Sequence, residues 1–103
     1  MAYEIKITED AAEDLDEIVG YITNVLKNPI AANNFLTEIE ENYSVLSSAP
    51  ESFAYCNDQR LRMLGYRKIP VKNYIVLYKT DNDAKIVYIM RIIYGRREYT
   101  KLI

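Results

Sequence analysis

The chain has 103 residues and is 50% hydrophobic, which is enough for one modest core and predicts a single domain over residues 1–103. It has no histidine and one cysteine, so catalytic Ser/His and Cys/His pairs, intrachain disulfides and ordinary zinc sites are excluded. The net charge is −2, and neither a secretion-signal pattern nor an apolar run near the roughly 20 residues that span a bilayer is present, so we expect a cytoplasmic protein without a membrane partner.

The first half of the chain predicts one strand and two helices. Residues 3–7 alternate between apolar and polar side chains, as in a half-buried strand. After Thr8, a suitable N-cap, apolar residues recur at spacings of three and four, which predicts an amphipathic helix ending near Lys27. Asn28-Pro29 is typical of a second helix start, and that helix ends before Pro50. Because the connection is short, the two helices should form an antiparallel hairpin.

The second half predicts a long connection and three strands. Residues 49–65 show no sustained period and hold at most a short turn of helix or strand. Residues 66–71 and 74–79 form a predicted hairpin, with Pro70 placing its first strand at a sheet edge. Residues 85–94 are the most continuously apolar segment and the best candidate for the middle of the sheet. The predicted class is α+β, with an N-terminal strand and the antiparallel helical hairpin packed on one face of a small, antiparallel-rich sheet.

Carboxylates and the single thiol give no clear catalytic signal. Five acids gather on the first predicted helix and have the oxygen chemistry of a magnesium site, but their positions opposite the apolar stripe favour a solvated face: Asp10, Glu13, Asp14, Asp16 and Glu17. Cys56 has no histidine to lower its pKa and is interpreted as a structural or incidental thiol. We therefore expect neither a metal nor a cofactor.

Charge is divided unequally along the chain. Residues 1–58 carry 2 basic and 12 acidic side chains, whereas residues 59–103 carry 11 basic and 3 acidic ones. This asymmetry favours a C-terminal half that faces a polyanion, either nucleic acid or an acidic protein segment, although the two halves can also neutralise each other across the fold. The basic side chains with a predicted role in binding a target or nucleic acid are Arg60, Arg62, Lys68, Lys72, Arg96 and Lys101.

The end of the last predicted strand combines arginines with tyrosines. Tyr94 and Tyr99 bracket Arg96 and Arg97, and such pairs of aromatic rings and guanidinium groups are typical of RNA or single-strand binding. Cleavage of RNA would need a base, an acid and stabilisation of the phosphorane charge. Arginine supplies the last of these, whereas tyrosine or lysine moves protons only with a perturbed pKa. The plainer alternative is that Arg96 and Arg97 solvate a fraying terminus.

Four segments together carry a resemblance to a known family: YEIKITEDAAEDLDEI, AANNFLTEIEENYSVLSSAP, GYRKIPVKNYIVLYK and RIIYGRRE. In their order and spacing they resemble the RelE/ParE superfamily of toxins of type II toxin–antitoxin modules, over residues 3–102. The resemblance implies the α+β fold predicted above and a cognate antitoxin as partner. It also implies one of two targets, because RelE cuts mRNA on the ribosome and ParE poisons DNA gyrase.

The resemblance to RelE implies active-site roles for some positions. Arg67 falls where RelE has an active-site lysine and Arg97 where it has an active-site arginine, but Ile75 stands where RelE has another arginine, and the RelE catalytic tyrosine has no counterpart before Ile103. For a nuclease, the candidate catalytic residues are Arg67, Arg91, Tyr94, Arg97 and Tyr99. Such a catalytic site requires the three arginines to lie together on one open surface.

The helical hairpin and the RIIYGRRE ending resemble ParE more closely than RelE. The sequence therefore favours a gyrase-directed toxin. A RelE-like, metal-independent and ribosome-dependent mRNA endoribonuclease is the first alternative, and a non-toxic binding module for an acidic partner is the second.

Overall fold

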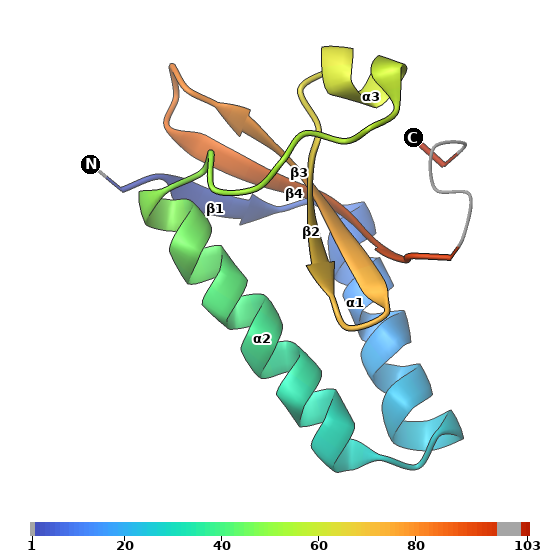
Figure 1. Ribbon diagram of the computed structural model, residues 1–103. Coiled ribbons are helices and arrows are strands. Elements are labelled where there is room, and N and C mark those ends of the chain that lie inside the picture. The colour runs from blue at the N-terminus through green and yellow to red at the C-terminus, as the bar shows by residue number, and fades with distance from the viewer. Residues whose placement is uncertain (1, 97–101) are drawn as a thin grey trace.

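A computed structural model describes residues 2–96 and 102–103. It contains two long helices, one short helix and one four-stranded sheet (Figure 1). The elements, in chain order, are β1 (Glu4–Ile7), α1 (Glu9–Gly20), a π-helical turn (Tyr21–Val25), α2 (Pro29–Ser48), α3 (Gln59–Met63), β2 (Arg67–Val71), β3 (Tyr74–Asp81) and β4 (Ile86–Tyr94). The strand order is β1-β4-β3-β2, in which β1 is parallel to β4 and the other neighbours are antiparallel.

The long helices start where the sequence predicts. The Thr8 side chain accepts a hydrogen bond from the Ala11 amide at the start of α1, and the Asn28 side chain caps α2 in the same way. The first predicted helix does not stay α-helical to Lys27, because it passes into the π-helical turn after Gly20. Glycine followed by several β-branched residues weakens a regular α-helix, which gives a physical reason for this change.

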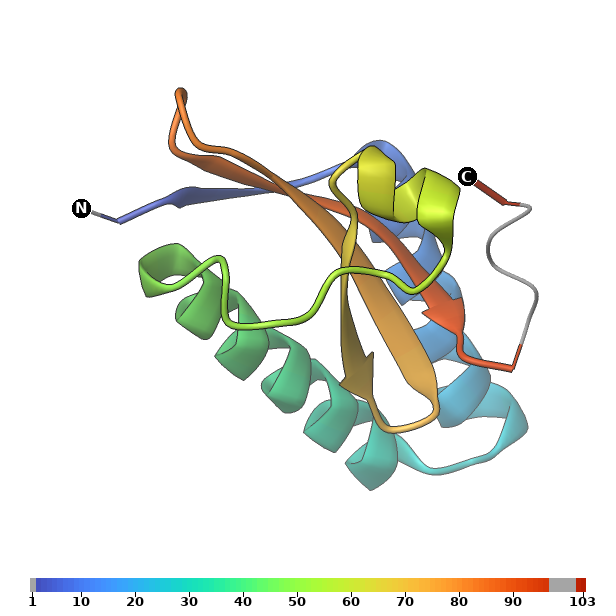
Figure 2. The same ribbon diagram turned by 45° about the horizontal axis from the view of Figure 1, so that its top comes forward.

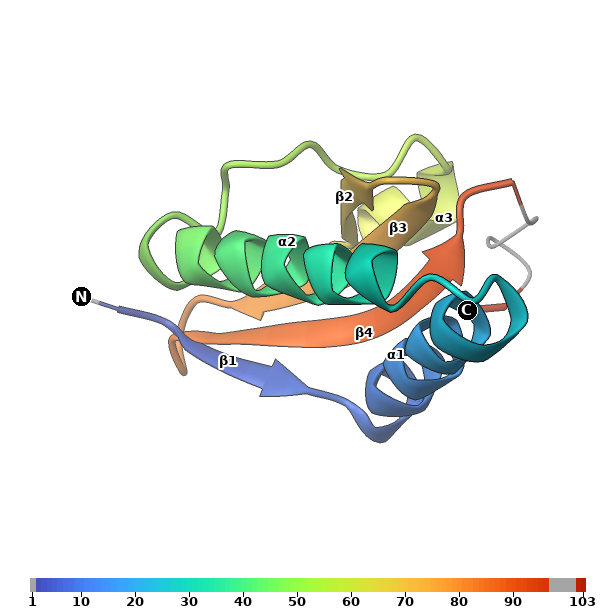
Figure 3. The same ribbon diagram turned by 90° about the horizontal axis from the view of Figure 1, so that it is seen from below.

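The sheet separates two apolar clusters. α1 and α2 lie on one face (Figure 3), where the larger cluster is centred on Phe35, Ile39 and Tyr78. On the other face, the short α3 (Figure 2) contributes Leu61 to a smaller cluster with Leu77. The α+β class, the helical hairpin on one face, the edge position of β2 and the interior position of β4 are thus confirmed.

The connection between α2 and β2 is more ordered than its sequence indicates. The Cys56 amide donates to the Tyr66 carbonyl, and the Lys68 amide donates to the Ala54 carbonyl, so residues 54–56 lie along the outer edge of β2. Asp58 caps α3 through its side chain, which accepts from the Leu61 amide at 3.0 Å. Cys56 itself is fully buried, which fits the structural role predicted for its thiol.

Tyr78 provides a pH-dependent part of the core. Its hydroxyl donates to the Pro50 carbonyl at 2.7 Å, and burial raises the pKa of Tyr78 to about 12 from its ordinary value of 10.0. Since the folded pKa is raised, the stabilisation is present in full below the unfolded pKa and is lost as the pH rises from about 10 to about 12.

We expect Tyr78→Phe to cost about 1 kcal/mol at neutral pH, because the Pro50 carbonyl loses its donor. Between pH 10 and 12, the variant should lose less additional stability than the parent, since phenylalanine cannot ionise. Urea unfolding across this pH range measures both effects. Tyr88→Phe, on the other face of the sheet, is the control. An equally steep alkaline loss in the Tyr78 variant would contradict the prediction.

Candidate functional site

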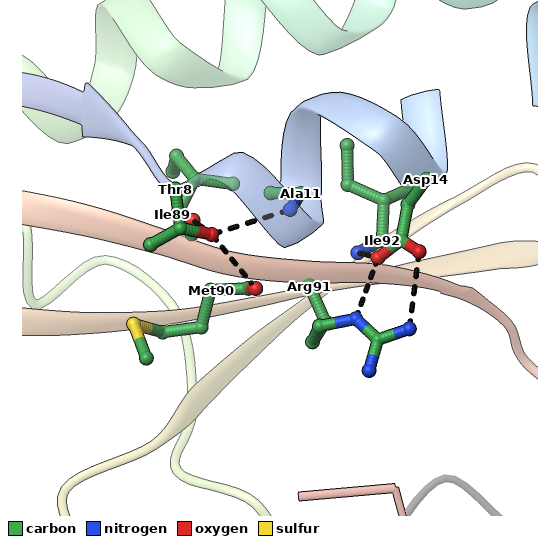
Figure 4. A network of polar contacts seen from close by, with 7 residues as sticks. All are labelled: Thr8, Ala11, Asp14, Ile89, Met90, Arg91 and Ile92. Atoms are coloured by element: carbon green, nitrogen blue, oxygen red, sulfur yellow. Dashed lines mark hydrogen bonds and ion pairs between the residues drawn. The ribbon is translucent and has the colours of Figure 1, made fainter. Parts of the chain in front are cut away.

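Arg91 is held by a carboxylate of α1 (Figure 4). Its Nε lies 2.7 Å from Asp14 Oδ2 and its Nη2 lies 3.0 Å from Asp14 Oδ1, so the two side chains form a bidentate pair. Asp14 Oδ2 also accepts from the Ile92 amide at 2.9 Å. One carboxylate therefore satisfies three donors of β4, two from a guanidinium group and one from the backbone.

This arrangement exists because β1 is shorter than β4. β1 pairs with β4 only as far as Ile7 and Ile89, and the chain then turns into α1. Beyond that point, the Thr8 hydroxyl lies 2.9 Å from the Ile89 carbonyl and 3.0 Å from the Met90 carbonyl, within donating distance of both. Further along the same edge of β4, the Asp14 side chain accepts a hydrogen bond from the Ile92 amide. Side chains of α1 and its N-cap thus form hydrogen bonds with the β4 backbone beyond the point where its pairing with β1 ends.

The Asp14 pair changes the interpretation of both partners. The solvated-face prediction is wrong for Asp14, whose side chain is only 14% exposed. The hydrogen bonds that Arg91 donates to Asp14 raise the pKa of Arg91, and the nearby Asp10 and Glu17 act in the same direction. Arg91 is therefore compensated by carboxylates, whereas the nuclease alternative requires it to be free to bind phosphate.

Arg67 is engaged by the connection before β2. Its Nη1 donates to the Phe53 carbonyl at 2.6 Å, and its guanidinium lies 3.8 Å from the centre of the Tyr55 ring. Both contacts come from the connection between α2 and β2, whose residues 54–56 lie along the outer edge of the sheet. Stacking of this kind stabilises the connection and occupies one face of the guanidinium group.

Arg67 and Arg91 do not meet. Arg67 pairs with Tyr78, whose side chain belongs to the cluster under the helices, whereas Arg91 pairs with Leu77, which belongs to the cluster on the other face. An irregularity in the pairing of β3 with β4, a β-bulge at Met90, sets this register. The expectation that these arginines share one open surface is wrong, because strand alternation sends them to opposite faces.

The other predicted basic residues are spread over the fold. Arg60 Nη2 donates to the Ile103 carbonyl at 2.9 Å, and Arg62 is exposed on the same short helix, α3. Lys68 pairs with Leu77 and so belongs to the face that α3 covers, whereas Lys72 Nζ lies 3.6 Å from Glu38 on α2. Arg96 is exposed after β4. Three further predicted site residues, Arg97, Tyr99 and Lys101, lie outside the described residues.

Tyr94 belongs to a groove between α1, the start of α2 and the ends of β3 and β4. Three adjoining hollows form this groove, and the one that contains both Leu26 and Tyr94 has a volume of about 470 Å³. The residues shared between hollows define what we call the aromatic groove: Tyr21, Leu26, Asn73, Tyr74 and Tyr94. Arg91 and Tyr94, two of the candidate catalytic residues of the nuclease alternative, both line one of these hollows.

Tyr74 connects the groove to the core. Its ring meets the Tyr94 ring edge-on at 5.6 Å between centres and the Phe35 ring at 5.3 Å. Burial raises the pKa of Tyr74, and the neighbouring Tyr21 and Tyr94 act in the same direction. Because the raised pKa keeps the Tyr74 hydroxyl protonated at neutral pH, Tyr74 is suited to contact and not to general base catalysis.

The described residues contain neither a membrane-spanning helix nor a cluster of metal-binding side chains. No helix in the described part is both long and apolar enough to cross a bilayer. Within residues 2–96 and 102–103, no three histidine, cysteine, aspartate or glutamate side chains are placed to hold a metal ion together. The described α1 carboxylates act through hydrogen bonds and charge, as Asp14 does on Arg91.

Similarity to known proteins agrees with the fold. The chain is similar to a chain of the chromosomal ParDE toxin–antitoxin system of P. aeruginosa, with 23% identity, 90% of this chain and 96% of that chain covered, and a TM-score of 0.70. It is also similar to a chain of the RelBE2 toxin–antitoxin complex of Mycobacterium tuberculosis, with 19% identity, coverages of 91% and 99%, and a TM-score of 0.64. A third similar structure is a variant of E. coli RelE in the free state, with 12% identity, 99% of this chain and 93% of that chain covered, and a TM-score of 0.67.

At these identities, the solved structures show a shared fold and no more. A search of curated proteins gave no significant match. The sequence profile described as the ParE toxin of the type II toxin–antitoxin system parDE, however, matches residues 5–99, which is nearly the whole chain. The chain therefore belongs to the ParE toxin family of type II toxin–antitoxin systems.

Proposed function

We propose that this chain stops cell growth by inhibiting DNA gyrase in the cytoplasm, without cutting RNA, and that a cognate antitoxin silences it. The observation that carries the proposal is the bidentate contact between Arg91 and Asp14. It compensates the one arginine of β4 that a nuclease would need for phosphate. Membership of the ParE family supports the same target.

The surroundings of Arg91 also fit poorly with RNA cleavage. Transfer of the 2′-hydroxyl to phosphorus needs a base, an acid and a positive group around a single phosphate. Arg67 lies on the opposite face, and Ile75, at the position of a RelE arginine, packs against the apolar cluster beneath α3. The tyrosines of the described chain for which a shift is resolved all have a raised pKa, the wrong direction for a base.

A cognate antitoxin is the partner expected of this family. The similar structures from P. aeruginosa and M. tuberculosis are a ParDE system and a RelBE2 complex, so those relatives are paired with antitoxins. A flexible antitoxin segment would become ordered when it binds the toxin, and it would cover exposed apolar surface. In cells, expression of this chain alone should arrest growth, and coexpression of the antitoxin should restore it.

A paired assay tests the target. We expect the purified chain to abolish ATP-dependent supercoiling of relaxed plasmid by gyrase, while a type I topoisomerase in a matched reaction keeps its activity. In parallel, a translation reaction with a defined mRNA should show no new 5′ ends by primer extension. New ends within the reading frame, with gyrase unaffected, would establish the RelE-like alternative. Active gyrase, intact mRNA and normal growth would leave the non-toxic binding module.

A further inference from the structure

One side of the aromatic groove is acidic. On α1, Asp10, Asp14, Glu17 and Tyr21 follow each other at spacings of four, three and four, which places them on one stripe of the helix. Asp14 and Glu17 line the hollow that contains both Arg91 and Tyr94, and Asp10 and Glu17 both raise the pKa of Arg91. Because Arg91 is paired with Asp14, the positive charge of Arg91 does not fully compensate the carboxylates of Asp10 and Glu17.

The outer carboxylates of this stripe remain available to a partner. Asp10 and Glu17 are exposed, and no hydrogen bond or ion pair joins either side chain to another residue of the described chain. Besides Asp14, Glu17 and Arg91, the described residues that line the hollows include one more charged side chain, that of Lys72, whose Nζ lies 3.6 Å from Glu38. On the α1 side of the groove, the three carboxylates of Asp10, Asp14 and Glu17 outnumber the one guanidinium of Arg91, so this side is negative although the C-terminal half of the sequence is basic.

Exposed apolar side chains line the groove beside this acidic stripe. Tyr21 is 47% exposed, Leu26 is 56% exposed and Tyr94 is 37% exposed. Beyond them, the tip of the helical hairpin presents Val25 and Ile30, which are 65% and 74% exposed. Exposed apolar side chains gathered next to a charged rim are a mark of an interaction surface.

We propose that the aromatic groove binds a cationic, amphipathic peptide segment of a protein partner. Lysine or arginine side chains of this segment would face Asp10 and Glu17, and its apolar side chains would cover Tyr21 and Leu26. An arginine of the segment can also stack on the exposed ring of Tyr94. The inference concerns a surface separate from the choice between gyrase and mRNA, and its test does not depend on that choice.

Charge decides against two other occupants. Phosphate groups of a nucleic acid would approach the uncompensated carboxylates of Asp10 and Glu17 and be repelled. A second copy of the chain in a two-fold symmetric contact would bring the same acidic stripe to both sides of the interface, which places like charges close together. A basic segment meets both the acidic and the apolar requirement.

Fluorescence anisotropy with defined probes tests the proposal on the full chain. The first probe is a labelled 14-residue peptide of leucine and lysine with helical amphipathic spacing, and the second replaces every lysine with glutamate. We expect the lysine peptide to bind and the glutamate peptide to bind at least about tenfold more weakly, with an affinity that falls as salt increases. Failure of the lysine peptide to bind would overturn the proposal.

A charge reversal locates the binding. Glu17→Lys should weaken binding of the lysine peptide roughly tenfold, whereas Glu41→Lys, an exposed position on α2 outside the groove, should leave it within about twofold. Equal effects of the two variants would place the peptide elsewhere and refute the site. The site would also be refuted if a labelled single-stranded oligonucleotide bound the parent chain in competition with the peptide, or if the chain were a dimer that Glu17→Lys dissociated.

Discussion

Asp14→Ala should destabilise the fold by about 3 kcal/mol, the largest loss we expect from any carboxylate of α1. The variant leaves the Arg91 guanidinium, whose side chain is only 24% exposed, without its bidentate acceptor. It also leaves the Ile92 amide without an acceptor at the part of β4 that β1 does not reach. Urea unfolding followed by circular dichroism measures the loss.

The matched control for this variant is Asp16→Ala, which removes an exposed carboxylate from the same helix and should cost less than about 0.5 kcal/mol. Arg91→Met should cost less than Asp14→Ala, because the Ile92 amide keeps its acceptor. The double variant should then lose clearly less than the sum of the single losses. Equal stabilities of the Asp14 and Asp16 variants would show that the pair does not support the edge of β4.

Much of the fold could be predicted because its signals are local. The caps at Thr8 and Asn28, the helical spacing of apolar residues and the alternation in the strands depend on neighbours a few residues apart. Pro70 likewise indicated an edge strand from its missing amide proton alone, and β2 does lie at the edge. Such patterns predict elements and the faces they bury.

The candidate site could not be predicted in the same way, because its contacts depend on register. Asp14 and Arg91 are 77 residues apart, and the bulge at Met90 decides which face Arg91 takes. One local signal was nevertheless available: Asp14 lies three residues after Ala11 and four before Ile18, both buried. This spacing puts Asp14 on the buried stripe of α1, where a carboxylate needs a partner.

The charge asymmetry of the sequence was also a poor guide to local surfaces. The basic half supplies Arg91 and Lys72 to the groove region, and each lies beside a carboxylate of the acidic half. The two halves thus neutralise each other at these points, as the alternative interpretation of the charge pattern expects. What remains uncompensated at the groove is acidic, so a partner's chemistry has to be inferred from neighbouring side chains and not from totals along the chain.

Phe35→Ala should give a still larger loss, about 4 kcal/mol, because it removes the aromatic ring that joins α2 to the floor of the aromatic groove. Phe35 is 1% exposed, its ring meets Tyr74 edge-on at 5.3 Å, and it lines the inner end of the groove. Typical domains have only about 5–15 kcal/mol of stability, so thermal unfolding should shift by many degrees.

Two variants distinguish the contribution of the Phe35 ring from that of α2 in general. Phe35→Leu keeps most of the apolar volume and should lose roughly 1–2 kcal/mol, while Leu36→Ala, at the adjacent and partly exposed position of α2, should lose less than Phe35→Ala. Because Tyr74 packs between Phe35 and Tyr94, the leucine variant should also bind the lysine peptide more weakly although it remains folded. Unchanged peptide affinity in that variant would show that the groove keeps its shape without support from the core.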